Sequence, residues 1–230
     1  MIPLRDTIPS RNKPLMTRFI IALNVVVFLL QFITPDDQVS GLVYYFGFIP
    51  GEFGEVLKTQ PVSVLGYYPI VTSLFLHGGL FHLISNMWAL WIFGDNVEDL
   101  MGHSRFLVFY LLCGVIANLS HFLFNAVSSI PAIGASGAIA GVMGAYVILF
   151  PFSRIVTLVP LLFIPLFFNI PAVIYLFIWF FSQLYSGAVY SLIDGRMVGG
   201  IAWWAHVGGF IAGVLLHKLF RRRRKYGFMY

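Results

Sequence analysis

The run ASGAIAGVMGAYVILFP, residues 135–151, decides the class of fold. It contains no charged side chain, and a helix that crosses a membrane needs roughly 20 mostly apolar residues. Gly137, Gly141 and Gly144 recur in it at intervals that line one side of a helix. Small residues on one side allow a second helix to approach closely. We therefore expect a membrane-spanning helix here that packs tightly against another.

Five more runs of this kind lie on either side of it, at residues 18–34, 72–93, 104–125, 169–189 and 200–220. The whole chain is 59% hydrophobic and 10% charged, whereas soluble domains carry about 25% charged residues. The sequence therefore predicts an all-α polytopic membrane protein with six transmembrane helices.

Residues 155–168 form one more apolar stretch, which is interrupted by Pro160 and Pro165. At this length it is too short to span a bilayer comfortably, and proline disfavours a continuous helix. We interpret it as an interfacial or re-entrant segment.

The lysines and arginines indicate how the chain is oriented. A six-helix arrangement places most of the 14 on one side and leaves only Lys58 and Arg196 on the other. The cations on the first side are Arg5, Arg11, Lys13, Arg18, Arg105, Arg154, Lys218, Arg221, Arg222, Arg223, Arg224 and Lys225. The positive-inside rule then puts both termini in the cytoplasm, as an even number of helices also requires. The predicted location is the cell membrane, with multiple spans.

This topology divides the chain into three parts. Residues 1–17 form a cytoplasmic N-terminal segment, residues 18–220 the six-helix domain, and residues 221–230 a basic cytoplasmic tail. Beside a membrane helix, such a tail is better suited to anionic lipid than to nucleic acid. Residues 35–70 form a long outer loop between the first two helices, and loops of that length are often functional.

The motif Gly134-Ala-Ser136-Gly137 stands where the 135–151 helix begins. A helix start offers free backbone N–H groups, which can stabilise an oxyanion forming beside a serine. Glycine on both sides lets a substrate backbone come close. The alternative is that Ser136 merely caps the helix while the glycines serve packing. The motif alone leaves both interpretations open.

His206 favours the catalytic interpretation. It lies near the outer end of the last predicted helix, at a depth similar to that of Ser136, and Gly209 and Gly213 share its helix face. Neutral histidine is a suitable base for activating a serine hydroxyl at pH 7. The glycines would let the two helices approach until these short side chains touch. A structural histidine with satisfied hydrogen bonds is the alternative.

His82 and Asn86 lie four residues apart and share one face of the second predicted helix. Both can donate hydrogen bonds to a developing oxyanion. A hydrogen bond that bridges two helices is the competing interpretation for this pair.

Metal and aspartyl chemistry are less well supported. A metal site built from His77, His82 and His206 would lack a His-Glu-x-x-His motif and an intramembrane carboxylate. None of the nine acidic residues falls inside a predicted span, so an aspartyl protease pair is absent. A Ser-His dyad without metal or cofactor is the predicted site.

Taken together, these motifs resemble the rhomboid family of intramembrane serine proteases. The matching stretches are His77-Gly-Gly-Leu-Phe-His82-Leu-Ile-Ser-Asn86, Phe93-Gly-Asp-Asn-Val-Glu98-Asp99, Gly134-Ala-Ser136-Gly137 and Ala205-His206-Val-Gly-Gly209 with Gly213. The resemblance implies that Ser136 is the nucleophile and His206 the general base. It also implies an oxyanion hole made by His82, Asn86 and the Ser136 backbone N–H.

The resemblance further implies that the first loop lies laterally in the outer leaflet and that the fifth helix borders the substrate's route. Many members carry Trp-Arg where this chain has Tyr68-Pro69, and some carry a tyrosine, stacked on the histidine, where it has Ala140. We therefore expect loop anchoring and the support of His206 to differ from those members.

The predicted activity is that of a serine endopeptidase, which hydrolyses peptide bonds in or near the transmembrane segments of single-pass proteins. Its partners would be those substrates and the lipid bilayer; nucleic acid is not expected. The alternative is a catalytically inactive rhomboid-like protein that binds membrane proteins. A transporter would be expected to show repeated halves or a charged pathway. The sequence leaves the oligomeric state and the natural substrate open.

Overall fold

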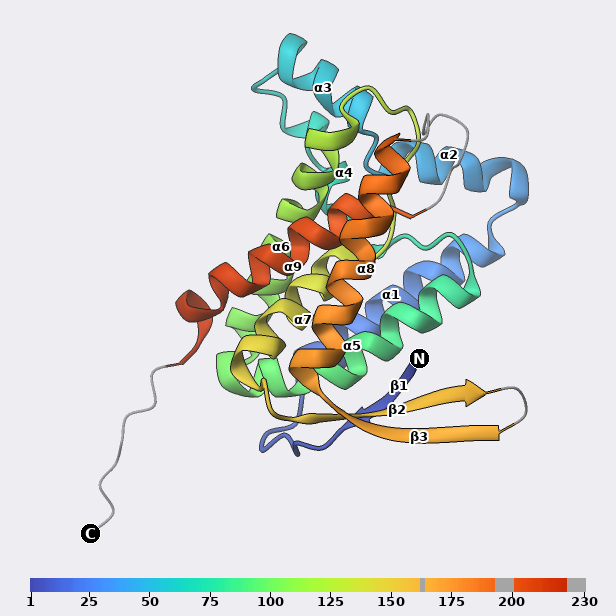
Figure 1. Ribbon diagram of the computed structural model, residues 1–230. Coiled ribbons are helices and arrows are strands. Elements are labelled where there is room, and N and C mark those ends of the chain that lie inside the picture. Colours follow the sequence, from blue (N-terminus) through green and yellow to red (C-terminus); the bar gives the residue numbers. More distant parts are fainter. Residues whose placement is uncertain (162–163, 193–200, 223–230) are drawn as a thin grey trace.

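The computed structural model describes residues 1–161, 164–192 and 201–222. Six long helices lie near the predicted positions: α1 (Leu15–Ile33), α5 (Leu80–Met101), α6 (His103–Asn125), α7 (Ser136–Leu149), α8 (Ala172–Leu192) and α9 (Trp203–Phe220). They pack into one bundle (Figure 1). Arg196, and the basic tail from residue 223 onward, lie outside the described residues.

Three of these helices, α1, α6 and α8, are long and apolar enough to cross a membrane. Helix α5 makes a fourth span if it is joined to the segment Val64–Phe75, from which it is bent by 83°. Helix α7 is apolar but has only 14 residues. The chain is therefore a mostly helical polytopic membrane protein with three or four spans by length and composition. Six spans remain a prediction.

The predicted bounds of the second helix, residues 72–93, are wrong at both ends. The preceding chain forms two short helices, α4 (Pro69–Thr72) and η2 (Ser73–Phe75), and then breaks at Gly78–Gly79 before α5 begins at Leu80. Helix α5 also continues to Met101, through the carboxylates Asp95, Glu98 and Asp99, which lie beyond the end of the predicted span. Glu98, within this extension, finds hydrogen-bond partners in the first turn of α1.

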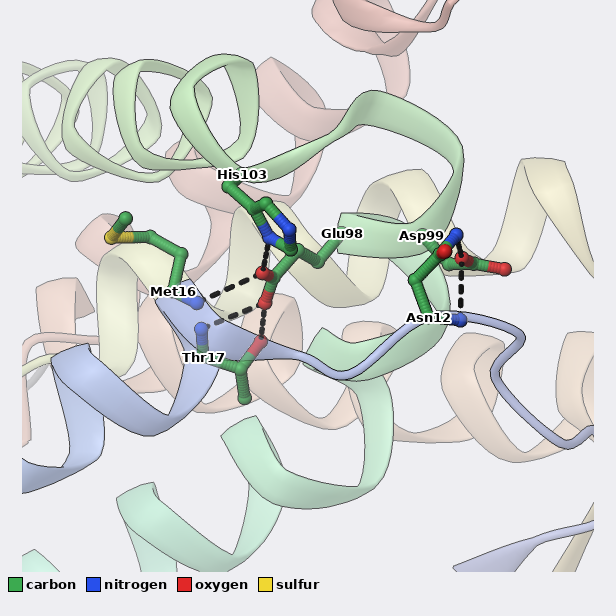
Figure 2. A network of polar contacts seen from close by, with 6 residues as sticks. All are labelled: Asn12, Met16, Thr17, Glu98, Asp99 and His103. Atoms are coloured by element: carbon green, nitrogen blue, oxygen red, sulfur yellow. Dashed lines mark hydrogen bonds and ion pairs between the residues drawn. The ribbon is translucent and has the colours of Figure 1, made fainter.

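Glu98 provides the main link between α5 and α1 (Figure 2). Its side chain is only 1% exposed. Its carboxylate accepts hydrogen bonds from the backbone N–H groups of Met16 at 2.8 Å and Thr17 at 2.7 Å. It also contacts the His103 ring. These N–H groups lie in the first turn of α1, where they have no partner within the helix and favour a negative charge. Asp99 accepts a hydrogen bond at 3.1 Å from the backbone N–H of Asn12, in the segment that precedes α1.

The predicted outer loop is folded rather than extended. It contains α2 (Asp36–Phe46), α3 (Pro50–Thr59) and the 3₁₀ turn η1 (Val64–Gly66). Phe53 packs its ring against Phe122 of α6, with ring centroids 5.2 Å apart. The Tyr68 hydroxyl donates to the Tyr45 carbonyl at 2.8 Å. Tyr68 therefore anchors the loop at the place where this chain was expected to differ from the family that it resembles.

The all-α prediction is wrong in one respect, because three antiparallel strands lie against the bundle. They are β1 (Ile2–Asp6), β2 (Arg154–Leu161) and β3 (Ile164–Pro171), in the order β1-β2-β3. The stretch predicted as an interfacial or re-entrant segment, residues 155–168, thus lies in the paired strands β2 and β3, apart from residues 162–163, which lie outside the described residues. The helix expected from residue 169 begins at Ala172. Its prolines exclude a helix but are tolerated in strands whose N–H groups are not needed for pairing.

Asp6 ties the base of this sheet to the helices. Its carboxylate accepts from the Tyr146 hydroxyl at 2.6 Å and from the Asn96 amide at 2.8 Å. Burial raises the pKa of Asp6 to about 6, because its effect outweighs that of the Tyr146 hydrogen bond, which lowers the pKa. The N-terminal segment therefore packs on the helical domain rather than standing apart from it.

Candidate active site

Helices α7 and α9 pack with their backbones in contact, as their glycine-lined faces predict. A Cβ atom placed on Gly209 would overlap the carbonyl oxygen of Gly137. One placed on Gly213 would overlap the carbonyl oxygen of Gly141. Any side chain at these positions would push the helices apart, so only glycine permits the approach. This contact brings the first turns of the two helices together.

Ser136 and His206 meet at that point. Ser136 is the first residue of α7 and is half-buried, whereas His206 lies in the first turn of α9 and is 9% exposed. The distance from Ser136 Oγ to His206 Nε2 is 2.8 Å. Gly134 has a φ of +122°, a value that favours glycine. The two residues singled out from the sequence are therefore within hydrogen-bond distance.

Gln183 of α8 is a third member of this arrangement, and the sequence analysis missed it. His206 Nδ1 lies 2.8 Å from Gln183 Oε1, and the glutamine is 7% exposed. Because an amide oxygen only accepts, Nδ1 carries the proton and Nε2 offers its lone pair to the Ser136 hydroxyl. One signal could have found it, since a lone amide in a predicted membrane span needs a partner.

Two indole rings flank the imidazole of His206. The Trp179 ring of α8 lies 5.9 Å from it between centroids, at 35°. The Trp203 ring lies 6.2 Å from it at 88°. Ala140, the position at which no stacking tyrosine was expected, is fully buried within α7. In this chain, aromatic side chains from α8 and α9 therefore support the histidine instead.

His82 and Asn86 lie against the loop that precedes Ser136. A Cβ atom placed on Gly134 would come within 2.8 Å of His82 Nε2 and 3.8 Å of Asn86 Nδ2. One Asn86 N–H donates to the His82 carbonyl at 3.0 Å within their own helix. Since a side-chain amide has two N–H donors, the other has no partner in the described residues. Both side chains thus border the site, two residues before the serine.

The same loop is fixed from its other side. The Gly134 N–H donates to the Ser73 carbonyl at 2.9 Å. The Asn118 amide of α6 donates to the Ser73 hydroxyl at 3.0 Å and to the Ile70 carbonyl at 2.9 Å. The backbone leading to Ser136 is therefore held by contacts from two other segments.

The alternative metal site requires His77, His82 and His206 to converge on one point. The His77 ring does lie beside that of His82, with centroids 5.1 Å apart. Within the described part of the chain, however, no group of three or more histidine, cysteine or acidic side chains is placed to hold a metal ion.

Comparisons with known proteins identify the family of this chain. The profile of the rhomboid domain matches residues 65–223, which include Ser136, His206 and Gln183. The chain belongs to the rhomboid family. This membership confirms the resemblance inferred from the motifs.

Two rhomboid relatives show how far the similarity extends. The human presenilin-associated rhomboid-like protein, a mitochondrial protein, is 28% identical over 203 residues, which are 85% of this chain and 45% of the human protein. The rhomboid protease GluP of Bacillus subtilis is 34% identical over 137 residues, which are 59% of this chain and 25% of GluP. This rhomboid chain therefore spans less than half the length of either relative.

Proposed function

We propose that this rhomboid is an intramembrane serine endopeptidase that cleaves single-pass membrane proteins in or near their transmembrane segments. The observation that carries the proposal is the 2.8 Å contact between Ser136 Oγ and His206 Nε2, where two apolar helices touch. The relative GluP is itself named a rhomboid protease. An inactive binder would need the fold but not this contact.

The geometry supports a two-step acyl transfer. His206 Nε2 takes the Ser136 proton as Oγ attacks the scissile carbonyl, and then gives that proton to the leaving amine. The resulting ester on Ser136 is hydrolysed by a water molecule that His206 deprotonates in turn. Gln183 holds the Nδ1 proton throughout at 2.8 Å. Because an amide is neutral, it orients the ring without stabilising its charge as a carboxylate would.

The oxyanion formed in each step needs donors already in place. The Ser136 backbone N–H is one, since the first residue of α7 has no intrahelical acceptor. Asn86 contributes its second amide N–H, and His82 a ring N–H from the side facing Gly134. These three donors approach the serine from α5 and α7.

The topology inferred from the cations belongs to the same proposal. Both termini would face the cytoplasm, with the Ser136 end of α7 toward the outer side. The protease core would be residues 18–220, with residues 1–17 packed on it through β1. The alternation of α5, α6 and α7 agrees with this orientation. Glu98 lies in the last turn of α5, α6 then runs from His103 to Asn125, and Ser136 is the first residue of α7.

The direct test uses the purified full chain in proteoliposomes with a single-pass reporter protein. We expect products whose new ends, located by mass spectrometry, fall in or near the reporter's transmembrane segment. A fluorophosphonate should label the protein, and EDTA should leave both results unchanged. Binding of the intact reporter without cleavage or labelling would instead show an inactive binder. Activity restored only by zinc would favour the metal hypothesis.

Gln183→Leu tests the role of the hydrogen bond between His206 Nδ1 and Gln183. The variant leaves the Nδ1 proton without an acceptor, and a buried polar group without a partner costs about 1–3 kcal/mol. We expect kcat to fall by roughly 5- to 150-fold, with little change in KM. Gln183→Glu should restore turnover, because a carboxylate also accepts the Nδ1 proton. The acidic limb of its pH–rate profile should move to higher pH, because the carboxylate favours the charged imidazole.

Both Gln183 variants need a stability measurement on the same preparation. A purely structural glutamine would lower the unfolding temperature in the leucine variant and leave kcat of the folded fraction unchanged. In that case the glutamate variant would show an unshifted pH profile. Either result would remove Gln183 from the catalytic arrangement.

Asn86→Ala separates an oxyanion donor from a structural bridge. Removing one such donor typically costs about 10²–10³ in kcat when others stay fixed. We therefore expect strongly reduced but measurable turnover and a nearly unchanged KM. Stability should fall by no more than a typical interhelical hydrogen bond, about 0.6 kcal/mol. Full turnover combined with a large loss of stability would show that Asn86 is structural.

A further inference from the structure

The β2–β3 hairpin exposes an apolar surface that the proposed catalysis does not use. Residues 155–168 contain no charged side chain. Near the tip, Leu161 is 57% exposed and Ile164 62%. Phe167 and Phe168 on β3 are 63% and 47% exposed. In Figure 1 the hairpin leaves the bundle beside α5 and extends past it.

The contacts of β1 indicate the direction of the hairpin. The Trp88 ring N–H donates to the Pro3 carbonyl at 2.6 Å, and the Asn96 amide donates to Asp6 at 2.8 Å. Eight helical residues rise about 12 Å, and three strand residues about 10 Å. Strand β1 therefore lies alongside α5, from near its Glu98 end toward its middle. Pairing of Asp6 with Ile155 carries β2 in the same direction.

A strand edge left open in hydrocarbon is costly, because its backbone groups have no partners. The prolines of β3 reduce this cost. Pro160 pairs with Pro165, and since neither has an N–H group, this must be a non-hydrogen-bonded pair. Backbone groups of Pro165 therefore point away from β2.

The alternation of an antiparallel ladder extends this result along β3. Phe167, Asn169 and Pro171 also point their backbone groups to the open edge. The Ala172 N–H donates to the Ser153 carbonyl at 2.7 Å. This bond agrees with the alternation, because Ala172 follows Pro171 and should point its backbone groups toward β2. Two of the four edge positions are thus prolines. Only the N–H groups of Phe167 and Asn169 remain there.

Polar groups gather at the other end of the hairpin. Arg154 caps the edge by donating to the Asn169 carbonyl at 3.3 Å. Arg5 pairs with Val156, two residues along β2 from Arg154, so both arginines lie on one face of the sheet. Both are exposed. An apolar tip with a basic base fits a leaflet of anionic lipids, with hydrocarbon at the tip and phosphates at the base.

We propose that strands β2 and β3 insert into the leaflet at the Glu98 end of the bundle, with Leu161 and Ile164 among the acyl chains and Arg5 and Arg154 on anionic headgroups. The prolines of β3 make this insertion tolerable by removing half of the N–H groups that would face lipid. The hairpin would be a second attachment to the bilayer beside the spanning helices. It does not depend on catalytic activity.

Depth-dependent fluorescence tests the insertion. Cys113 is the only cysteine, so a Cys113→Ala background allows an environment-sensitive NBD dye to be placed through Ile164→Cys. Lys58→Cys serves as the control, because that side chain is 72% exposed on α3. In vesicles of phosphatidylcholine and phosphatidylglycerol, the dye at position 164 should be quenched by spin-labelled acyl chains. It should resist aqueous iodide several-fold better than the dye at position 58. Equal iodide quenching would overturn the proposal.

Two further experiments test the contacts of the arginines with headgroups and whether lipid or a second chain covers the open edge of β3. Replacing Arg5 and Arg154 with glutamine in the Ile164→Cys protein should abolish any gain in depth that phosphatidylglycerol gives over pure phosphatidylcholine. Equal depth in all four cases would overturn the anionic-lipid contact.

Pyrene placed through Phe167→Cys reports a second copy, because paired edges bring two dyes together. Excimer emission that survives dilution with lipid would show that another chain, not lipid, covers the edge. Circular dichroism and gel filtration in detergent should confirm that each variant is folded.

Discussion

Ser136→Ala is expected to lower proteolytic turnover by about 10⁶-fold, the loss seen when a serine protease nucleophile is removed. The change deletes the only atom of Ser136 that contacts His206, the hydroxyl oxygen 2.8 Å from Nε2. The backbone N–H at the start of α7 remains in this variant, but oxyanion stabilisation cannot sustain cleavage without the nucleophile. The measurement is turnover of a single-pass reporter together with labelling by a fluorophosphonate.

Ser85→Ala is the matched control for the nucleophile. Its hydroxyl donates only to the His82 carbonyl of its own helix, at 3.0 Å. We expect that variant to keep turnover and labelling, and both proteins to unfold at nearly the parent temperature. If the Ser136 variant is labelled as strongly as the parent, another residue is the nucleophile and the assignment is wrong.

His206→Ala is expected to cause a loss of similar size, about 10⁶-fold, because nucleophile and base act as one unit. Without the imidazole, the Ser136 hydroxyl keeps its proton and is a weak nucleophile. Fluorophosphonate labelling should therefore disappear together with turnover. The variant also leaves Gln183 Oε1 without its hydrogen-bond donor, at a cost of about 1–3 kcal/mol. Activity should accordingly be measured on the folded, monodisperse fraction.

His217→Ala provides a control on the same helix. His217 is also buried, at 6% exposure, and its Nδ1 lies 2.7 Å from the Val214 carbonyl. It should retain turnover even if stability falls. Equal losses in the two histidine variants would indicate damage to α9 rather than to chemistry. Serine labelling that survives in His206→Ala would exclude His206 as the base.

The most informative residues of the sequence were those that are costly in free energy at membrane depth. Ser136 and His206 were found because polar groups in apolar runs need partners, and Gly209 and Gly213 because their spacing marks a helix contact. The structure brings all four to one helix pair, and the domain match confirms the family. Their catalytic roles remain predictions until the substitutions above are measured.

Gln183 was missed because its importance depends on a distant partner. Nothing near it in sequence shows that α8 places its amide 2.8 Å from an imidazole on α9. The end of α5 was misplaced for a similar reason. Charged residues usually end an apolar helix, but the Glu98 carboxylate accepts hydrogen bonds from N–H groups of α1, more than 80 residues earlier. Local sequence patterns do not predict such contacts between residues far apart in the chain.

The sequence by itself determined the membrane class, the approximate positions of the six helices and the serine, histidine and glycine residues of the candidate site. These features follow from single residues and short spacings, whose free-energy costs in a bilayer are large and local. Only the tertiary structure decided that β2 and β3 pair with each other and with β1 at the N-terminus, and that Gln183, Trp179 and Trp203 surround His206. Strand pairing and side-chain contacts between helices bring together residues far apart in the chain, and their stability depends on the geometry of both partners.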